Sequence, residues 1–339
     1  MGKNFASDNN SGVHPKVMDA MVRCNVGHMP GYGEDELSIE AIALIKETLG
    51  AKGAFFTLNG TGTNICLLDA MTSKYGAVMC TDLCHVYVHE AGAASKTGQF
   101  QLLPVPTEDG KLRPEQLDKF LQFKREFHFP HPEVITIAQT TEMGTVYTVE
   151  EIKELVAYAK KHGFKVHLDG SRIANACAKL GLSLKEMSGD LGIDALSFGM
   201  CKNGLMFGEC AVFFDDAHED FIHLLKADLQ LNSKGRYVAA QYLEILKDDL
   251  WLANAKNAND MAVYMHDCLT EIEQVKIVAG PESNMVFVQF PPEIIRDLQQ
   301  FMNFYLENAQ KNYSRLVCNF DTTKEDVDAF VNKVKELLA

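Results

Sequence analysis

Short apolar runs alternate with amphipathic stretches through the middle of the chain. The runs have the length and apolar character of buried strands, at 54–58, 77–81, 134–138, 166–168, 195–198 and 211–214. The amphipathic stretches predict helices at 35–49, 64–74, 115–124, 149–161 and 172–180. Before the fourth of these helices, Thr148 and Glu151 have the spacing of a capping box. This alternation predicts an α/β fold with a mostly parallel sheet flanked by helices.

The pattern changes after about residue 247. A long helix is predicted over 251–271, then strands at 275–278 and 285–290, a helix at 293–309 and a strand at 315–319. A closing helix has an apolar face that includes Val327, Phe330 and Val334, and Thr322 with Glu325 could form its capping box. We therefore predict two domains: a large one at 1–247, which includes the N-terminal segment, and a small C-terminal α+β domain at 248–339.

Composition narrows the classes of function. The 339 residues include 32 Lys+Arg and 46 Asp+Glu, a net charge of −14, which disfavours nucleic-acid binding. No apolar run approaches the roughly 20 residues of a membrane-spanning helix. The nine cysteines are scattered without a CxxC pair, which favours a reducing compartment. The first ten residues are polar and contain no apolar signal core, so we expect a cytoplasmic protein.

Three segments that follow predicted strands contain candidate chemistry. In Asn59-Gly60-Thr61-Gly62, a glycine turn opens a helix, whose free N–H groups and dipole favour an anion. In the segment 166–172, a buried strand ends at Asp169, whose cationic partner could be Arg172 or a protonated ligand nitrogen. In the segment 196–204, Lys202 follows a strand and could form a Schiff base.

A fourth segment is a cluster of metal-binding residue types. It comprises Cys80, Cys84, His85, His89 and Glu90. These could supply sulfur and nitrogen ligands to a metal, but their spacing does not match a zinc motif. We expect no metal, because a His85 ring stacked on an aromatic ligand would explain the histidine equally well.

Together these segments resemble the threonine aldolase/β-eliminating lyase group of fold-type-I pyridoxal-phosphate (PLP) enzymes. The resemblance starts at Ser7-Asp8-Asn9 and Gly31-Tyr32-Gly33, runs through the four segments and the stretch Glu142–Tyr147, and ends at Arg315–Cys318. The form Lys202-Asn203-Gly204 looks like the low-specificity, phenylserine-aldolase-like branch. The large domain would then bind PLP.

The resemblance implies roles for individual residues around the cofactor. Lys202 matches the Schiff-base lysine, and Asp169 matches the carboxylate that keeps the pyridine nitrogen protonated. Arg172 matches the arginine beside the ring's 3-hydroxyl group. His85 matches the histidine stacked on the ring, which is also the family's candidate for handling the substrate's hydroxyl proton. Gly60 and Thr61 match the phosphate cradle.

Further roles concern the substrate and the neighbouring subunit. Ser7 and Arg315 match groups that hold the carboxylate of an amino-acid substrate. Tyr32 and Arg236 match positions that reach the active site, often that of a neighbouring subunit, with Arg236 at the cofactor and Tyr32 at the substrate. A homodimer or homotetramer with active sites at the subunit interface follows by analogy. A second histidine assists some members, and either His128 or His131 could serve here, with His128 assigned to the substrate.

Two departures from the family leave the substrate preference open. Ala6 stands where the family commonly has arginine, and Ala138-Gln139-Thr140 stands where it commonly has Glu-Asn-Thr. The expected reaction cleaves a β-hydroxy-α-amino acid, such as threonine or phenylserine, to glycine and an aldehyde. β-Elimination or transamination on the same cofactor is the first alternative. A non-catalytic ligand- or metal-binding protein that uses the Cys80–Glu90 cluster is the second.

Overall fold

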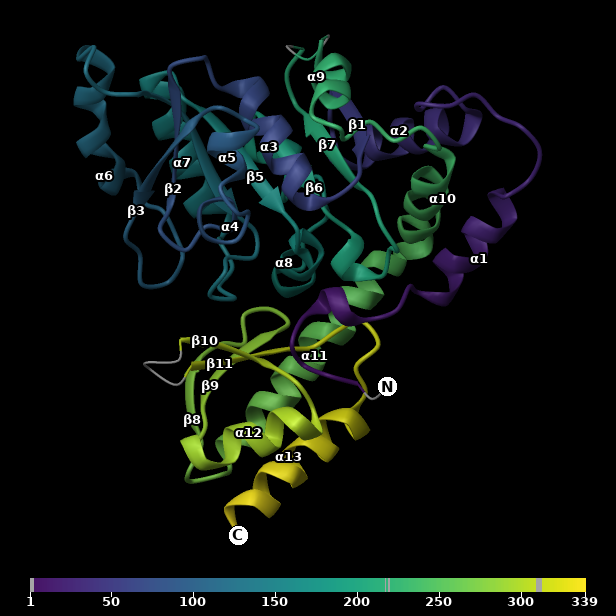
Figure 1. Cartoon of the computed structure of the whole chain (residues 1–339), viewed down its shortest axis with the longest axis vertical. Helices are drawn as coiled ribbons and strands as arrows, with labels where there is room; N and C mark the ends of the chain where they lie inside the picture. Colours follow the sequence, from purple (N-terminus) through teal and green to yellow (C-terminus); the bar gives the residue numbers. More distant parts are fainter. Residues whose placement is uncertain (1–2, 217, 219, 309–312) are drawn as a thin grey trace.

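The protein consists of two sheets with their covering helices, joined by one long helix, α11 (Figure 1). This computed structural model describes residues 3–216, 218, 220–308 and 313–339. The helices are α1 Pro15–Cys24, α2 Glu36–Leu49, α3 Gly60–Met71, α4 His85–Val88, α5 Ala93–Lys96, α6 Pro114–Leu117, α7 Val149–His162, α8 Ile173–Leu180, α9 Phe221–Ala227, α10 Arg236–Ile245, α11 Leu250–Thr270, α12 Pro292–Phe301 and α13 Lys324–Leu338.

The large sheet has the strand order β1-β7-β6-β5-β4-β2-β3. Neighbours from β3 to β6 pair in parallel, whereas β7 is antiparallel to both β6 and β1. The strands are β1 Gly53–Thr57, β2 Gly76–Thr81, β3 Gln101–Val105, β4 His131–Ala138, β5 Lys165–Gly170, β6 Ala195–Phe198 and β7 Glu209–Phe213. The mostly parallel α/β architecture expected from the sequence is confirmed.

Side chains of the large sheet alternate between two apolar layers. Val78, Val134 and Ala211 pack in one layer with residues of α3, whereas Met79 and Ile135 face the other layer with residues of α2 and α7. A strand with both faces covered in this way reads as a continuous apolar run, as the sequence shows. The predicted capping box of α7 is present, with Thr148 Oγ1 accepting from the Glu151 amide at 3.2 Å.

The small sheet is antiparallel, in the order β10-β11-β9-β8. Its strands are β8 Lys276–Ala279, β9 Met285–Gln289, β10 Tyr305–Asn308 and β11 Tyr313–Val317. A separate core forms between this sheet and α11, α12 and α13. Phe5 from the N-terminal segment packs into it, with its ring centroid 5.2 Å from that of Phe330. The domain division between 247 and 248 stays a prediction.

Several sequence predictions need correction. The helix predicted over 293–309 ends at Phe301, and β10 follows, because these residues pair with β11. The capping box of α13 is formed by Thr323 and Asp326, one residue later than predicted, since Thr322 Oγ1 instead accepts from the Asn319 amide at 2.8 Å. In 115–124 only a short helix forms, followed by a 3-10 helix, Asp118–Arg125.

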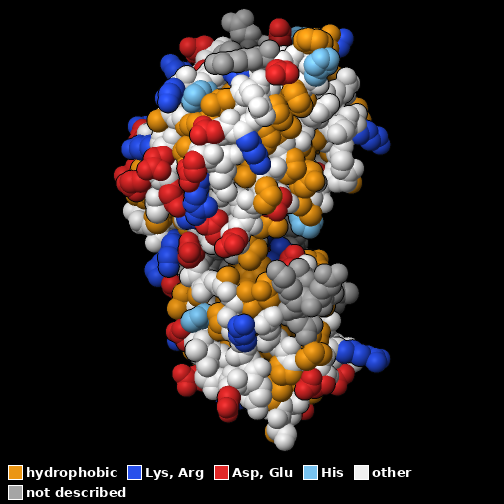
Figure 2. Space-filling view, turned by 90° about the vertical axis from the view of Figure 1, so that its left-hand side faces the viewer, with side chains coloured by type: hydrophobic (Ala, Val, Ile, Leu, Met, Phe, Trp, Pro, Cys, Tyr) orange, Lys and Arg blue, Asp and Glu red, His pale blue; other side chains and the backbone are white. Residues whose placement is uncertain are grey.

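Some elements were not predicted at all. β3 is an edge strand that contains Pro104, and edge strands tolerate proline because their outer N–H groups need no partner. The helices α1, α9 and α10 also lacked a prediction. Among the described residues, no helix combines the length and apolar character needed to cross a membrane. Figure 2 shows acidic and basic side chains interspersed over the visible face.

Candidate active site

One cavity of about 530 Å³ brings together six of the residues singled out in the sequence. They come from five separate parts of the chain: Ser7, His85, Asp169, Arg172, Lys202 and Arg315. Ligands of parallel sheets bind at the carboxyl ends of the strands. Asp169 and Arg172 lie at that end of β5, and Lys202 lies just after that end of β6. Arg315 comes from β11 of the small sheet, so the cavity lies between the two sheets.

Asp169 is held as a buried, charged acceptor. Its Oδ1 accepts from the Ser171 amide and hydroxyl at 2.9 and 2.6 Å, and its Oδ2 accepts from Asn64 Nδ2 at 2.9 Å. Burial raises the pKa of Asp169, but the Lys202 charge and these hydrogen bonds hold the pKa below its ordinary value. The carboxylate therefore stays ionised at neutral pH.

The cationic partner of Asp169 is not Arg172. The Arg172 guanidinium donates from Nε to Asp8 Oδ2 at 2.6 Å and from Nη2 to Asp8 Oδ1 at 2.8 Å. The sequence left open an ion pair between Arg172 and Asp169, but Arg172 pairs with Asp8 instead. Of the two partners that the sequence left open for Asp169, the protonated nitrogen of a ligand remains.

Lys202 lies in a 3-10 turn, Cys201–Asn203, at the end of β6. The turn is fixed on both sides, because Glu209 Oε2 accepts from the Met200 amide at 3.0 Å and Asn203 Nδ2 donates to the Trp251 carbonyl at 2.9 Å. Burial and the charge of Arg172 lower the pKa of the Lys202 amine, and they outweigh the charges of Asp8, Asp169 and Glu209, which raise it. The net shift favours the neutral, nucleophilic amine.

His85 begins α4 and is oriented by a buried carboxylate. Its Nδ1 lies 2.8 Å from Glu90 Oε1, which also accepts from Asn64 Nδ2 at 3.0 Å. The Cys80 and Cys84 side chains point into the apolar layer around α3. Among the residues that the structure describes, no group of three or more His, Cys, Asp or Glu side chains could hold a metal ion.

Arg315 already has a carboxylate partner. Its Nη1 lies 3.0 Å from Glu307 Oε1 on the adjacent strand β10, while its buried Nε has no hydrogen-bond partner. Ser7 is buried, and its Oγ accepts from the Asn9 amide at 3.1 Å. The cavity thus has guanidinium donors and a hydroxyl group on the side of the small sheet.

Other predicted residues do not line this cavity. Thr61 lines a separate hollow with Gln230 at the start of α3, where Gly60 has open space around its Cα. Tyr32 is exposed and lines a second, mainly apolar cavity of about 430 Å³, and Arg236 lines a third hollow, where its Nη1 donates to the Val26 carbonyl. His128 is exposed in the loop before β4. Roles for these residues stay predictions.

The cavity also contains residues to which the resemblance assigned no role at the cofactor or substrate. Glu142, His89 and Glu307 line it, as does Thr140, whose buried Oγ1 has no hydrogen-bond partner. Glu142 lies in the stretch Glu142–Tyr147 and His89 in the Cys80–Glu90 cluster, so the sequence motifs could have pointed to both as residues of the site. Glu307 had no such signal, because its segment was read as a helix. Asp8 was likewise quoted only as part of a motif.

These side chains fit the cofactor that the resemblance implies. A charged acceptor at Asp169 suits a protonated pyridine nitrogen, and the amine of Lys202 suits an aldehyde carbon. Thr140 Oγ1 is a polar atom in the cavity that still lacks a partner. The open glycine at the start of the 12-residue helix α3 suits a phosphate group.

Comparisons with known proteins agree with this assignment. A family model described as beta-eliminating lyase matches residues 4–295. A low specificity L-threonine aldolase of Pseudomonas aeruginosa is 36% identical, over 98% of this chain and 97% of that protein. One from Pseudomonas sp. is 33% identical over 99% and 98%.

A solved structure of Leishmania major threonine aldolase superimposes with a TM-score of 0.93 at 31% identity, covering 100% of both chains. The family match spans most of the sequence, and the relatives match almost their full length. The chain therefore belongs to the beta-eliminating lyase family and is a pyridoxal-phosphate-dependent lyase.

Proposed function

We propose that this enzyme cleaves β-hydroxy-α-amino acids of the threonine and phenylserine type to glycine and an aldehyde. The observation that carries the proposal is the single cavity in which Lys202, Asp169 and Arg315 converge from three parts of the chain. Relatives named low specificity L-threonine aldolase, similar over nearly their whole length, support the same activity.

Three residues prepare the site for the cofactor. Lys202 would provide the amine that attaches it, and Asp169 would keep its pyridine nitrogen protonated. Arg172, which Asp8 holds by two hydrogen bonds, would contact the ring's 3-hydroxyl group. When bound, pyridoxal phosphate supplies a ring that stabilises negative charge on the substrate's Cα. The backbone of Gly60 and Thr61, at the start of α3, would hold the phosphate.

The remaining residues select and orient the substrate. Ser7 and Arg315 hold the α-carboxylate, for which a guanidinium fork is well suited. Fixing the carboxylate determines which bond at Cα stands perpendicular to the ring, and we assign that orientation to the Cα–Cβ bond. His85, whose orientation is set by Glu90, would cover the ring face.

The assembly is part of the proposal. Tyr32 and Arg236 lie on the surface, outside the cavity of their own chain, which supports their action in the site of a neighbouring subunit. We propose a homodimer or homotetramer, with Arg236 at the cofactor and Tyr32 and His128 near the substrate. All nine cysteines are free thiols, which supports a cytoplasmic location.

Product analysis tests the proposed reaction. The purified enzyme, supplied with pyridoxal phosphate, should convert L-threonine or phenylserine to glycine and the matching aldehyde in equal amounts. Pyruvate-type keto acids with ammonia, and no glycine, would overturn the proposal in favour of β-elimination. A new amino acid formed from an added keto acid would indicate transamination instead.

A further inference from the structure

Glu142 is a carboxylate in the active-site cavity that has no role in the mechanism above. It lies in the turn between β4 and α7, and it lines the cavity together with His85 and Lys202. Its Oε1 accepts a hydrogen bond from the His85 amide at 2.7 Å. That contact fixes one carboxyl oxygen at the start of α4, so the side chain is held within the cavity wall.

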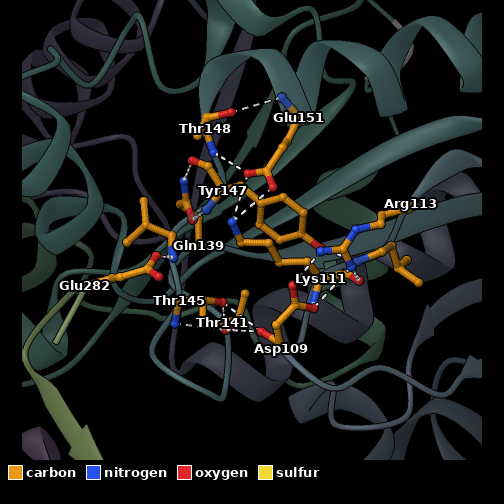
Figure 3. A network of polar contacts seen from close by, with 12 residues as sticks. Asp109, Lys111, Arg113, Gln139, Thr141, Thr145, Tyr147, Thr148, Glu151 and Glu282 are labelled. Atoms are coloured by element: carbon orange, nitrogen blue, oxygen red, sulfur yellow. Dashed lines mark hydrogen bonds and ion pairs between the residues drawn. The ribbon is translucent and has the colours of Figure 1, made fainter. Parts of the chain in front are cut away.

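Hydrogen bonds join the two ends of the turn that carries Glu142 (Figure 3). The Gln139 side chain accepts from the Tyr147 amide at 3.0 Å and donates to the Tyr147 carbonyl at 2.9 Å, so it bridges the two ends of the turn. Tyr147 in turn is fixed by its hydroxyl group, which accepts from the Leu112 amide at 2.6 Å. The base of the turn is therefore rigid.

The two threonines that flank Glu142 anchor the rest of the turn. Thr141 Oγ1 and Thr145 Oγ1 lie 2.7 Å apart, and Thr145 also donates to the Asp109 carbonyl at 2.8 Å. On the other side, Glu282 Oε2 accepts from the Val146 amide at 2.8 Å. A side chain that must meet a reacting atom needs this kind of support from the residues behind it.

The electrostatic surroundings suit proton transfer near neutral pH. Burial raises the pKa of Glu142 to about 7; the Asp169 charge acts in the same direction, whereas hydrogen bonds from backbone amides, including that of His85, and the His85 charge oppose it. The other groups that interact with its charge are Arg172, Cys84 and Tyr147. A base whose pKa lies near the working pH transfers protons most efficiently.

We propose that Glu142 is the catalytic base that takes the proton of the substrate's β-hydroxyl group. The inference rests on the proposed aldolase function. The O–H bond breaks and its proton moves to Glu142 Oε2, while the freed electron pair forms the second carbon–oxygen bond of the aldehyde. The Cα–Cβ bond breaks and leaves its electrons on Cα. A proton from solvent then completes glycine, and Glu142 releases its own proton to solvent.

The variant Glu142→Gln separates this role from a structural one. Glutamine keeps the size of the side chain and an oxygen for the His85 amide, but it cannot take a proton. Cleavage of L-threonine should slow by about 10²–10⁴-fold, and kcat should lose its rise with pH through neutrality. Exchange of the α-proton of glycine with D₂O involves no β-hydroxyl group, so its rate should stay close to that of the wild type.

A matched control and a cofactor-free measurement accompany this variant. Glu336→Gln makes the same substitution at an exposed glutamate of α13, outside the cavity, and cleavage should remain near the wild-type rate. Infrared spectra of the cofactor-free wild type should show a carboxyl band that titrates near neutral pH and is absent from Glu142→Gln. Glu209, also buried with a pKa of about 7, contributes a second band that only Glu209→Gln removes.

The outcomes are distinct. Unchanged cleavage in Glu142→Gln, or a parallel loss of cleavage and glycine exchange, overturns the assignment of Glu142 while the aldolase function stands. A wild-type enzyme that releases no aldehyde from either substrate overturns the proposed function and this inference with it.

Discussion

Arg172 and Asp8 form a two-point ion pair across a sequence separation of 164 residues. Both side chains are largely buried, with exposures of 12% for Arg172 and 1% for Asp8. Asp8 also accepts from Asn284 Nδ2 at 3.1 Å. The pair therefore connects the N-terminal segment, the end of the large sheet and the small sheet at the edge of the cavity.

Removing Asp8 should destabilise the protein strongly. Asp8→Ala leaves the Arg172 guanidinium without its carboxylate, and breaking such a buried pair costs roughly 3–5 kcal/mol of unfolding free energy. Urea denaturation measures the change. Asp260→Ala breaks the exposed pair with Lys256 and serves as the control, with a change within about 1 kcal/mol. Equal effects in the two variants would contradict the structural role of Asp8.

The contribution of Asp8 should also depend on pH. Burial raises the pKa of Asp8, but the charge and hydrogen bonds of Arg172 hold this pKa below its usual 3.8. A carboxylate with a lowered folded-state pKa stabilises the fold at pH above 3.8, and the contribution disappears as the pH falls through the folded-state pKa. Asp8→Asn should therefore differ most from the wild type at neutral pH and least in strong acid, as followed by urea denaturation.

Replacing Lys202 should abolish turnover and the covalent attachment of pyridoxal phosphate. Lys202→Ala removes the only amine that we place at the cofactor, so the visible absorption of the bound cofactor should be lost after dialysis. Lys335→Ala, on the exposed side of α13, should keep both the absorption and the activity. Near-normal turnover in Lys202→Ala would refute the assigned attachment point.

Arg315 and Glu307 should affect the substrate KM in opposite directions. Arg315→Lys keeps the charge but loses the guanidinium fork, and a charged hydrogen bond contributes roughly 1.5–3 kcal/mol, so KM should rise roughly 10- to 100-fold. Glu307→Gln removes the carboxylate that occupies Arg315 Nη1, so KM should fall. Steady-state kinetics with L-threonine tests both. A higher KM in Glu307→Gln would mean that Glu307 orients Arg315 rather than competing with the substrate.

The Tyr147 hydroxyl group should matter for stability. Tyr147 is fully buried, and Tyr147→Phe leaves the Leu112 amide without its acceptor, which costs roughly 1–3 kcal/mol. Tyr158→Phe removes a hydroxyl contact with Asp118 nearer the surface and should change stability by about 0.5 kcal/mol or less. Thermal or urea unfolding distinguishes the two. Equal changes would argue against a special role for the buried bond.

The local pattern of residues was sufficient for most of the large sheet. Strands β2, β4, β5, β6 and β7 are apolar runs because helices cover both of their faces, and such runs can be recognised in the sequence. Asp169 and Lys202 could be identified for the same reason, since Asp169 lies at the carboxyl end of β5 and Lys202 follows β6. Strand β3 escaped prediction because an edge strand with Pro104 lacks this pattern.

The small sheet was harder to predict. The residues of β10 show no strong alternation of apolar and polar side chains, and they form a strand through backbone pairing with β11. For this reason Glu307 was placed on a helix rather than on the strand next to that of Arg315. The one-residue error in the cap of α13 has a local cause, because Thr322 Oγ1 already accepts from the Asn319 amide.

By itself, the sequence determined the type of fold and the strand ends that carry the amine and the carboxylate, because periodicity and chain order are local properties. The tertiary structure alone decided that Arg172 pairs with Asp8, that Glu307 occupies Arg315, and that Glu142 reaches the cavity beside His85. The first and third contacts join segments far apart in the chain, and the second depends on the pairing of β10 with β11. Their geometry depends on how the two sheets and the turn after β4 pack together, and no short stretch of sequence encodes that packing.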